Sequence, residues 1–171
     1  MKRFLLFCIC LCSSFCCSMA LNIHVTKDGF RFDMNMTDGV ATLMGNSYSG
    51  NIVVPEKVVY DNQEYPVVAI GEMCFYNCTN LISVKIPNSV KSIGKNCFDS
   101  CQSLTSVELP NSIDAIPSAC FFACRSIETI SIPESVSSLG ESCFWSCTSL
   151  KSIHIPNGVT KLPSTCFAHC I

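Results

Sequence analysis

The feature that most constrains this chain is a five-residue pattern, Cys-Phe-x-x-Cys, that recurs at a constant interval. Successive copies lie 23 residues apart, and no insertion or deletion interrupts them. Repeats with a period of about 20–50 residues are typical of solenoids, in which each unit packs only against its neighbours. The sequence therefore predicts a stacked array instead of an ordinary globular domain. The five copies begin at Cys74, Cys97, Cys120, Cys143 and Cys166.

Each unit carries apolar residues at the spacing of a β-strand. In the unit that starts at Leu81, Val84 and Ile86 lie two residues apart, which places both side chains on one face of a strand. A proline follows directly, and because proline has no backbone N–H it ends the strand. We expect each unit to add one short strand to a curved parallel sheet. The prolines at this position are Pro87, Pro110, Pro133 and Pro156.

The second half of each unit supplies a turn and an aromatic residue. Gly94 and Gly140 alternate with Pro117 and Pro163 as turn signals. A phenylalanine then lies inside every Cys-Phe-x-x-Cys copy, and we expect this stretch to form a helical turn. Stacking brings each apolar column against its own copy in the next unit, which closes a core that one unit cannot close alone.

The first twenty residues have the composition of a secretory signal peptide. Lys2 and Arg3 precede an apolar run over 4–17, and small residues lie at Ser18 and Ala20, just before the expected cut. Cleavage after Ala20 leaves 9 basic and 13 acidic residues, a formal charge of −4. Neither nucleic acid nor an anionic membrane is therefore an expected partner. No later apolar run is long enough to span a bilayer, so we expect no membrane insertion after signal cleavage.

The segment between the signal and the repeats is expected to be a β-rich N-terminal cap over 21–70, followed by repeats over 71–171. Asp28-Gly29 and Asp38-Gly39 separate alternating runs and are hairpin signals. A solenoid needs an atypical first unit to cover its open core. The last Cys-Phe-x-x-Cys copy ends one residue before Ile171, so no capping segment follows it. We expect this chain to be a piece of a longer array, or to pair end to end with a copy of itself.

The pattern LxxVxIPxxVxxIGxxCFxxC resembles the BspA-like leucine-rich repeat family of bacterial surface proteins. The resemblance covers about 70–171, and the preceding segment is similar to that family's N-terminal cap. It implies a leucine-rich-repeat solenoid on a secreted or surface-exposed bacterial protein, and the family is associated with adhesion to host matrix proteins and with binding between cells. The chain departs from the family in one column, where cysteine replaces the usual alanine before the phenylalanine.

The ten cysteines that remain after cleavage admit four roles. A disulfide within a unit is disfavoured because residues i and i+4 of a helical turn lie about 5–6 Å apart. A disulfide between units has a closer spacing, but stacked identical side chains point the same way. A metal site needs converging ligands and a redox site needs an electropositive setting, and neither recurs. The preferred interpretation is that the cysteines are reduced thiols packed in the core. They are Cys74, Cys78, Cys97, Cys101, Cys120, Cys124, Cys143, Cys147, Cys166 and Cys170.

Two outward columns are candidates for binding a protein ligand. One lies on the strand face and is polar with mixed charge, and the other directly follows the phenylalanine and is rich in aromatics, which are typical anchors of protein interfaces. Lateral packing under the adjacent loop is the alternative role for the aromatic column. The candidate residues are Lys85, Glu108 and His154 on the strand face, and Tyr76, Phe122 and Trp145 in the aromatic column.

No constellation of catalytic residues stands out, because the sequence has neither a glycine-rich phosphate loop nor recurring paired carboxylates. We therefore expect a non-enzymatic protein-binding module that is secreted or displayed on the bacterial surface and uses no cofactor. The expected ligand is an extracellular matrix protein or a protein on another cell. The alternative is a structural spacer within a longer surface protein.

Overall fold

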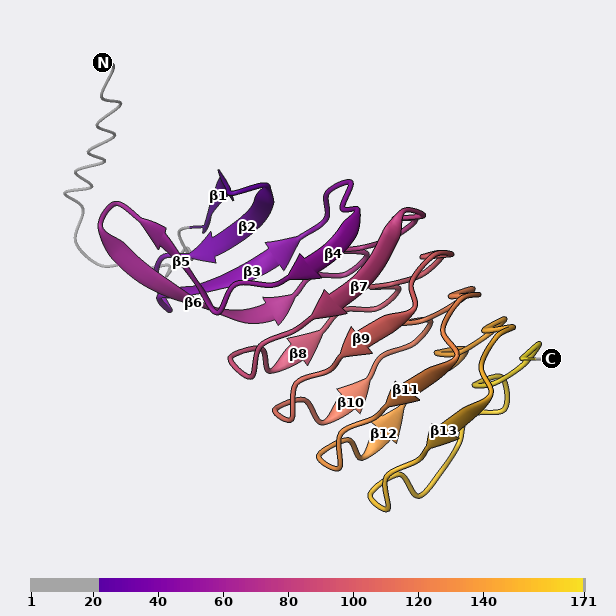
Figure 1. Ribbon diagram of the computed structural model, residues 1–171. Coiled ribbons are helices and arrows are strands. Elements are labelled where there is room, and N and C mark those ends of the chain that lie inside the picture. The colour runs from indigo at the N-terminus through magenta and orange to yellow at the C-terminus, as the bar shows by residue number, and fades with distance from the viewer. Residues whose placement is uncertain (1–21, 171) are drawn as a thin grey trace.

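The computed structural model of the protein describes residues 22–170, and the predicted signal peptide lies outside them. Figure 1 shows a β-rich N-terminal part followed by regularly stacked turns of chain that end at the opposite side of the molecule. The strands of the first part are β1 (Asn22–Lys27), β2 (Phe30–Asn35), β3 (Val40–Met44), β4 (Gly50–Val53), β5 (Lys57–Tyr60) and β6 (Gln63–Ile70). Those of the stacked part are β7 (Leu81–Lys85), β8 (Ser92–Ile93), β9 (Ser106–Glu108), β10 (Ala115–Ile116), β11 (Thr129–Ser131), β12 (Ser138–Leu139) and β13 (Ser152–His154).

The N-terminal part is a sheet with the order β1-β2-β3-β6-β5, built largely from hairpins. Asp28 and Gly29 connect β1 to β2 with φ angles of 51° and 82°. Two successive left-handed residues are the signature of the tight hairpin turn that Asp-Gly predicts. The hairpin between β2 and β3 is closed by Gly39, whose N–H donates to the carbonyl of Asn35 at 2.9 Å. Both predicted hairpins are present.

The stacked part is a solenoid of repeats, which we call rungs one (81–103), two (104–126), three (127–149) and four (150–170). The long strands β7 and β9 are parallel and pair in a register of 23 residues, with Val84 opposite Val107. Strand β4 pairs with β7 in the same direction, so Ile52 lies opposite Val84 at the start of the array. Short parallel strands, predicted from the sequence, thus line one side of the molecule, in two sheets instead of the single one expected (Figure 1).

A ladder of phenylalanines forms the centre of the core. The rings of Phe75, Phe98, Phe121 and Phe144 are fully buried, and neighbouring rings stack with centroids 5.0–5.4 Å apart. Tyr48 from the N-terminal part covers the first ring at 4.9 Å. Burying each phenylalanine contributes about 1.5–3 kcal/mol, and each aromatic contact adds about 0.5–1.5 kcal/mol. The same side chain therefore stabilises every rung.

The prediction of helical turns was wrong, because the structure has no helix within residues 22–170. Left-handed residues interrupt each Cys-Phe-x-x-Cys turn, such as Asn96 (φ 54°) and Ser100 (φ 63°). The N–H groups of Asn96, Phe98 and Ser100 then donate to carbonyls of the next rung, at 2.8–3.2 Å. A helix would direct these N–H groups along its own axis. The turn instead forms a ladder of hydrogen bonds between rungs.

The glycine and proline alternation decides which short strands pair. The N–H of Gly94 donates to Ile70, and that of Gly140 donates to Ile116, at 2.9 and 2.8 Å. A Cβ at Gly140 would overlap the backbone of Pro117 and Ser118, so only glycine permits this close approach. Pro117 has no N–H to donate. Accordingly β6 pairs with β8 and β10 with β12, whereas β8 and β10 do not pair.

The pairing of the strands β4, β7, β9, β11 and β13, which we call the long-strand face, is interrupted between different rungs from the pairing of the short strands β8, β10 and β12. Strand pairing along the long-strand face runs β4-β7-β9 and then β11-β13, with no pairing between β9 and β11 in the described part of the chain. Rungs two and three are instead joined by β10 and β12. Strand pairing between neighbouring rungs therefore alternates between the long-strand face and the short strands, and each pair of neighbouring rungs keeps one strand ladder.

Candidate binding surfaces

Two of the strand-face candidates form an ion pair with each other, and the third contacts a neighbouring loop. Lys85 on β7 lies opposite Glu108 on β9, and Nζ is 2.8 Å from Oε2. The hydrogen bond to Glu108 raises the pKa of Lys85. His154 on β13 instead places Nε2 3.1 Å from Oε1 of Glu134. The structure thus brings Lys85 and Glu108 together and leaves His154 on the other part of the divided sheet, so this face is polar and largely self-neutralised.

The aromatic candidates are brought together only in part. The rings of Phe122 and Trp145 stack with centroids 6.0 Å apart and an interplanar angle of 9°. His169 lies against Trp145 at 4.6 Å and is exposed, whereas Phe122 and Trp145 are half-buried. Asp99 occupies the position between Tyr76 and Phe122 in the repeat, so Tyr76 stands apart. We call Phe122, Trp145 and His169 the aromatic cluster.

Sequence reasoning missed His169 because it is one residue out of step with the aromatic column. Its φ of 62° is the left-handed value found at the last turn residue of the other rungs. That conformation is set by hydrogen bonds between rungs, such as the one from Ser146 N–H to Ala168 at 2.9 Å. The repeat itself offered the only signal, since His169 ends the last Phe-x-x turn.

The second cysteine of each unit has a defined hydrogen-bonding role. From the second copy on, its thiol donates to the carbonyl of the phenylalanine one rung earlier, such as Cys101 to Phe75 at 2.9 Å and Cys147 to Phe121 at 3.1 Å, whereas Cys78 in the first copy donates to Asn46. Burial raises the pKa of Cys101 and of Cys147 to about 12. These thiols therefore stay protonated at neutral pH, which suits a hydrogen-bond donor and opposes use as a nucleophile.

The first cysteine of each unit packs in the core beside the phenylalanine ladder. Cys74, Cys97 and Cys120 are buried, and burial raises the pKa of each thiol. Cys143 and Cys166 place their sulfur atoms 3.3 Å apart and share a hydrogen bond. All ten cysteines within residues 22–170 are free thiols, and Cys170 alone among them is partly exposed. No cluster of three or more His, Cys, Asp or Glu side chains in this part of the chain is placed to hold a metal ion.

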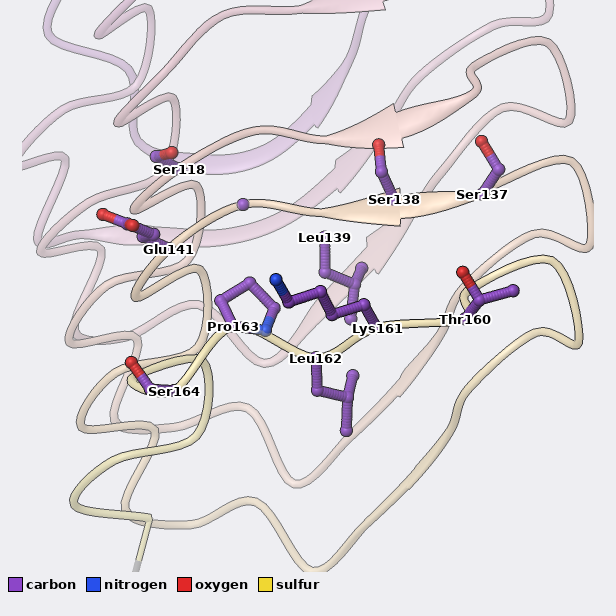
Figure 2. Close-up of a pocket in the computed structure, with 11 residues that line it drawn as sticks. Ser118, Ser137, Ser138, Leu139, Glu141, Thr160, Lys161, Leu162, Pro163 and Ser164 are labelled. Carbon is purple, nitrogen blue, oxygen red and sulfur yellow. The ribbon is translucent and has the colours of Figure 1, made fainter.

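A cavity of about 880 Å³ lies beside the short strand β12. Figure 2 shows Leu139 and Leu162 on neighbouring stretches of chain here, with Lys161 and Glu141 among the lining residues. Leu162 is 49% exposed, whereas Leu139 at the equivalent position is 6% exposed. Pro163 has no N–H to pair this segment with β12. The cavity is thus an open gap between rungs three and four, and its lining brings together no catalytic set of side chains.

A second hollow, of about 480 Å³, lies where the N-terminal part meets the first repeat turn. Two loops form it, 46–49 between β3 and β4 and 76–80 before β7. Every lining side chain is uncharged, and most are amides or hydroxyls. Sequence reasoning singled out only Tyr76 among these residues as a binding candidate, and Cys78 as a core cysteine, although both loops are visibly rich in Asn, Ser and Thr.

No helix in the described residues is long and apolar enough to cross a membrane.

Comparison with known proteins identifies the repeats. The BspA type leucine rich repeat region matches residues 61–171 in six copies. The structure is similar to the crystal structure of a Treponema pallidum (T. pallidum) leucine-rich repeat protein, with a TM-score of 0.75 and 29% identity over 86% of this chain and 68% of that one. A leucine-rich repeat protein from Bacteroides capillosus is similar at 33% identity, with a TM-score of 0.68 over 77% of this chain and 96% of that one. A search of curated proteins finds no match. The chain therefore belongs to the BspA-type leucine-rich repeat family.

Proposed function

We propose that this chain is a non-enzymatic protein-binding module of the bacterial cell surface or its surroundings, which contributes to adhesion to host matrix proteins or to other cells. The observation that carries the proposal is the aromatic cluster. Phe122, Trp145 and His169 lie outside the phenylalanine ladder, so the core does not account for them. Aromatic residues held on a rigid surface are the commonest anchors of protein interfaces.

The cluster is held in place by the rungs beneath it. The N–H of Ala123 donates to the carbonyl of Trp145 at 2.7 Å, so the backbones that carry Phe122 and Trp145 are tied together. Directly inside them, Phe121 and Phe144 stack at 5.4 Å. A surface fixed in this way loses little conformational entropy when a partner binds. The cluster is therefore suited to act as the central contact of an interface.

The charges of the strand face support a secondary role in the same function. Lys85 and Glu108 neutralise each other, and their side chains are 60% and 67% exposed. Exposed charge pairs of this kind contribute little affinity, but they influence the rate and orientation of association. We assign the strand face to the rim of the interface or to a separate, weaker contact.

Two features support export and the absence of catalysis. The basic start, apolar run and small residues before the cut in 1–20 are those of a signal peptide, and BspA-type repeats are typical of bacterial surface proteins. The buried thiols remain protonated at neutral pH and are enclosed by the core. A surface display role agrees with both.

The test is binding of the purified protein to a panel of immobilised extracellular matrix proteins and to intact bacterial cells. We expect the double substitution Phe122→Ala with Trp145→Ala to weaken binding about 30-fold or more, because interface anchors typically contribute at least about 2 kcal/mol. Thr148→Ala is the matched control, since Thr148 is exposed and lies three residues from Trp145. Binding that survives the double substitution would place the contact outside the aromatic cluster, and absence of binding to every member of the panel would favour the spacer role.

A further inference from the structure

We propose that the hollow between loop 46–49 and turn 76–80 binds a neutral pyranose unit of a glycan. This site lies at the opposite end of the array from the aromatic cluster, and the inference does not depend on the adhesion proposal. We call the hollow the junction site. Its lining residues are Asn46, Ser47, Tyr48, Ser49, Tyr76, Asn77, Cys78, Thr79 and Asn80.

The floor of the junction site is rigid. Tyr48 is 6% exposed, its hydroxyl donates to the carbonyl of Met44 at 2.9 Å, and its ring packs against Phe75. Burial raises the pKa of Tyr48 to about 12, so the phenol remains neutral. The Cys78 thiol lies 3.5 Å from the carbonyl of Asn46, between the two loops. The hollow is thus shaped by residues anchored in the core.

The two walls are also fixed relative to each other. The N–H of Gly50, just after the first loop, donates to the carbonyl of Asn80 at 2.8 Å. The N–H of Asn77 donates to Asp99 in the next rung at the same distance. These bonds hold both loops by their backbones and leave their side chains available. A pre-formed site of this kind avoids an ordering cost when a ligand binds.

The rim offers uncommitted polar side chains. Six exposed residues line the rim, and none of their side chains makes a hydrogen bond within residues 22–170. They are Ser47, Ser49, Tyr76, Asn77, Thr79 and Asn80. Hydroxyl and amide groups both donate and accept hydrogen bonds. The hydroxyls of a sugar have the same double capacity, so each can pair with a rim group in either direction.

The composition of the site favours a sugar over other ligands. No lining residue is charged, so an anionic or cationic ligand would find no counter-charge in the site. Tyr76 is 49% exposed and provides the aromatic surface against which the apolar C–H face of a pyranose packs. The volume of about 480 Å³ lies within the range of roughly 300–1,000 Å³ that is usual for small-ligand sites. An apolar peptide side chain would need an apolar lining that the rim lacks.

The repeat supplies a matched control for the site. Thr148 occupies the position of Thr79 three rungs later, at the same place in the turn and also exposed. Loop 46–49 has no counterpart beside rung three, so Thr148 lines none of the hollows described above. Thr148→Ala therefore reproduces the chemical change of Thr79→Ala without touching the junction site.

The experiment is saturation-transfer difference NMR and calorimetry on the purified protein with methyl glycosides of glucose, galactose, mannose and N-acetylglucosamine, and with sialic acid as the anionic probe. We expect at least one neutral glycoside to bind and sialic acid not to bind. Tyr76→Ala and Thr79→Ala should each weaken binding about tenfold, and Thr148→Ala should leave it within twofold. Tyr76→Phe, which keeps the ring, should retain most of the affinity.

Several outcomes would overturn the inference: binding of none of the neutral glycosides, preference for sialic acid, or equal effects of Thr79→Ala and Thr148→Ala. Because Tyr76 and Thr79 are exposed, we expect their variants to fold, and circular dichroism checks this. If Tyr76→Ala does not fold, Thr79→Ala against Thr148→Ala decides alone. A glycan array with separate host and bacterial polysaccharide panels identifies the source of the sugar, and binding on either panel supports the site.

Discussion

Shortening one phenylalanine of the core ladder should destabilise the protein by an amount that depends on its position. Phe98 is fully buried and stacks on Phe75 at 5.0 Å and on Phe121 at 5.2 Å. Replacing a buried phenylalanine by alanine costs about 3–5 kcal/mol through lost burial and the cavity left behind. With two stacked partners lost, we expect Phe98→Ala to lower the free energy of unfolding by about 4–5 kcal/mol.

Phe167 provides the comparison within the same ladder. Among the described residues it stacks only on Phe144, at 5.4 Å, and it is partly exposed. Because Phe167 buries less surface than Phe98 and has one stacking contact in place of two, we expect Phe167→Ala to cost about 2 kcal/mol. The difference between the two variants tests whether stacking between rungs stabilises the fold.

The assay is urea unfolding followed by fluorescence of Trp145, which is the single tryptophan of the chain, and by circular dichroism. With a slope of about 2 kcal/mol per molar urea, Phe98→Ala should lower the midpoint by about 2 M and Phe167→Ala by about 1 M. Coincidence of the two probes checks that the array unfolds as one unit. Equal costs at the two positions would refute the reasoning, and so would a cost below about 1 kcal/mol at Phe98.

Two further predictions concern glycine contacts and thiol ionisation. Gly140→Ala should destabilise the protein by about 3 kcal/mol in urea unfolding, because the added Cβ would overlap the backbone of Pro117 and Ser118. Gly158→Ala is the control and should cost much less, because a Cβ there meets its nearest atom at 3.2 Å. Similar losses of stability for the two variants would contradict the close-packing argument. Burial raises the pKa of Cys101 and Cys147 to about 12 in the folded state. The free energy of unfolding should therefore be at its full value below about pH 8.5, where these thiols are protonated in both the folded and the unfolded protein. It should fall as the pH rises toward 12, because the thiols then ionise in the unfolded protein first. Unfolding midpoints measured from pH 7 to 10 check this. If the double variant Cys101→Ala with Cys147→Ala lost stability with pH as steeply as the unsubstituted protein, the explanation would be contradicted.

Much of the fold follows from the sequence because the repeat makes it nearly one-dimensional. A 23-residue period with fixed apolar columns leaves stacking as the only way to bury those columns. The Asp28-Gly29 hairpin was predictable because two left-handed residues in succession have a strong local signal. In both cases, the information lies within a few residues or within one repeat.

The parts that sequence reasoning missed depend on contacts between distant residues. Asn96 and Ser100 adopt left-handed conformations because their N–H groups bond to the next rung, and no local pattern distinguishes this turn from a helical one. The junction site joins loops from different elements, so neither loop predicts it alone. Each miss reflects geometry that exists only after the rungs stack.

The alternation of the strand ladders has a consequence for how neighbouring rungs are held together. Rungs one and two are joined by β7 and β9, rungs two and three by β10 and β12, and rungs three and four by β11 and β13. Where the strands of one face are unpaired between two rungs, the strands of the other face are paired between the same two rungs. Within the described residues, every interface between neighbouring rungs therefore keeps one hydrogen-bonded strand ladder, and the ladder alternates between the two faces from the first rung to the fourth.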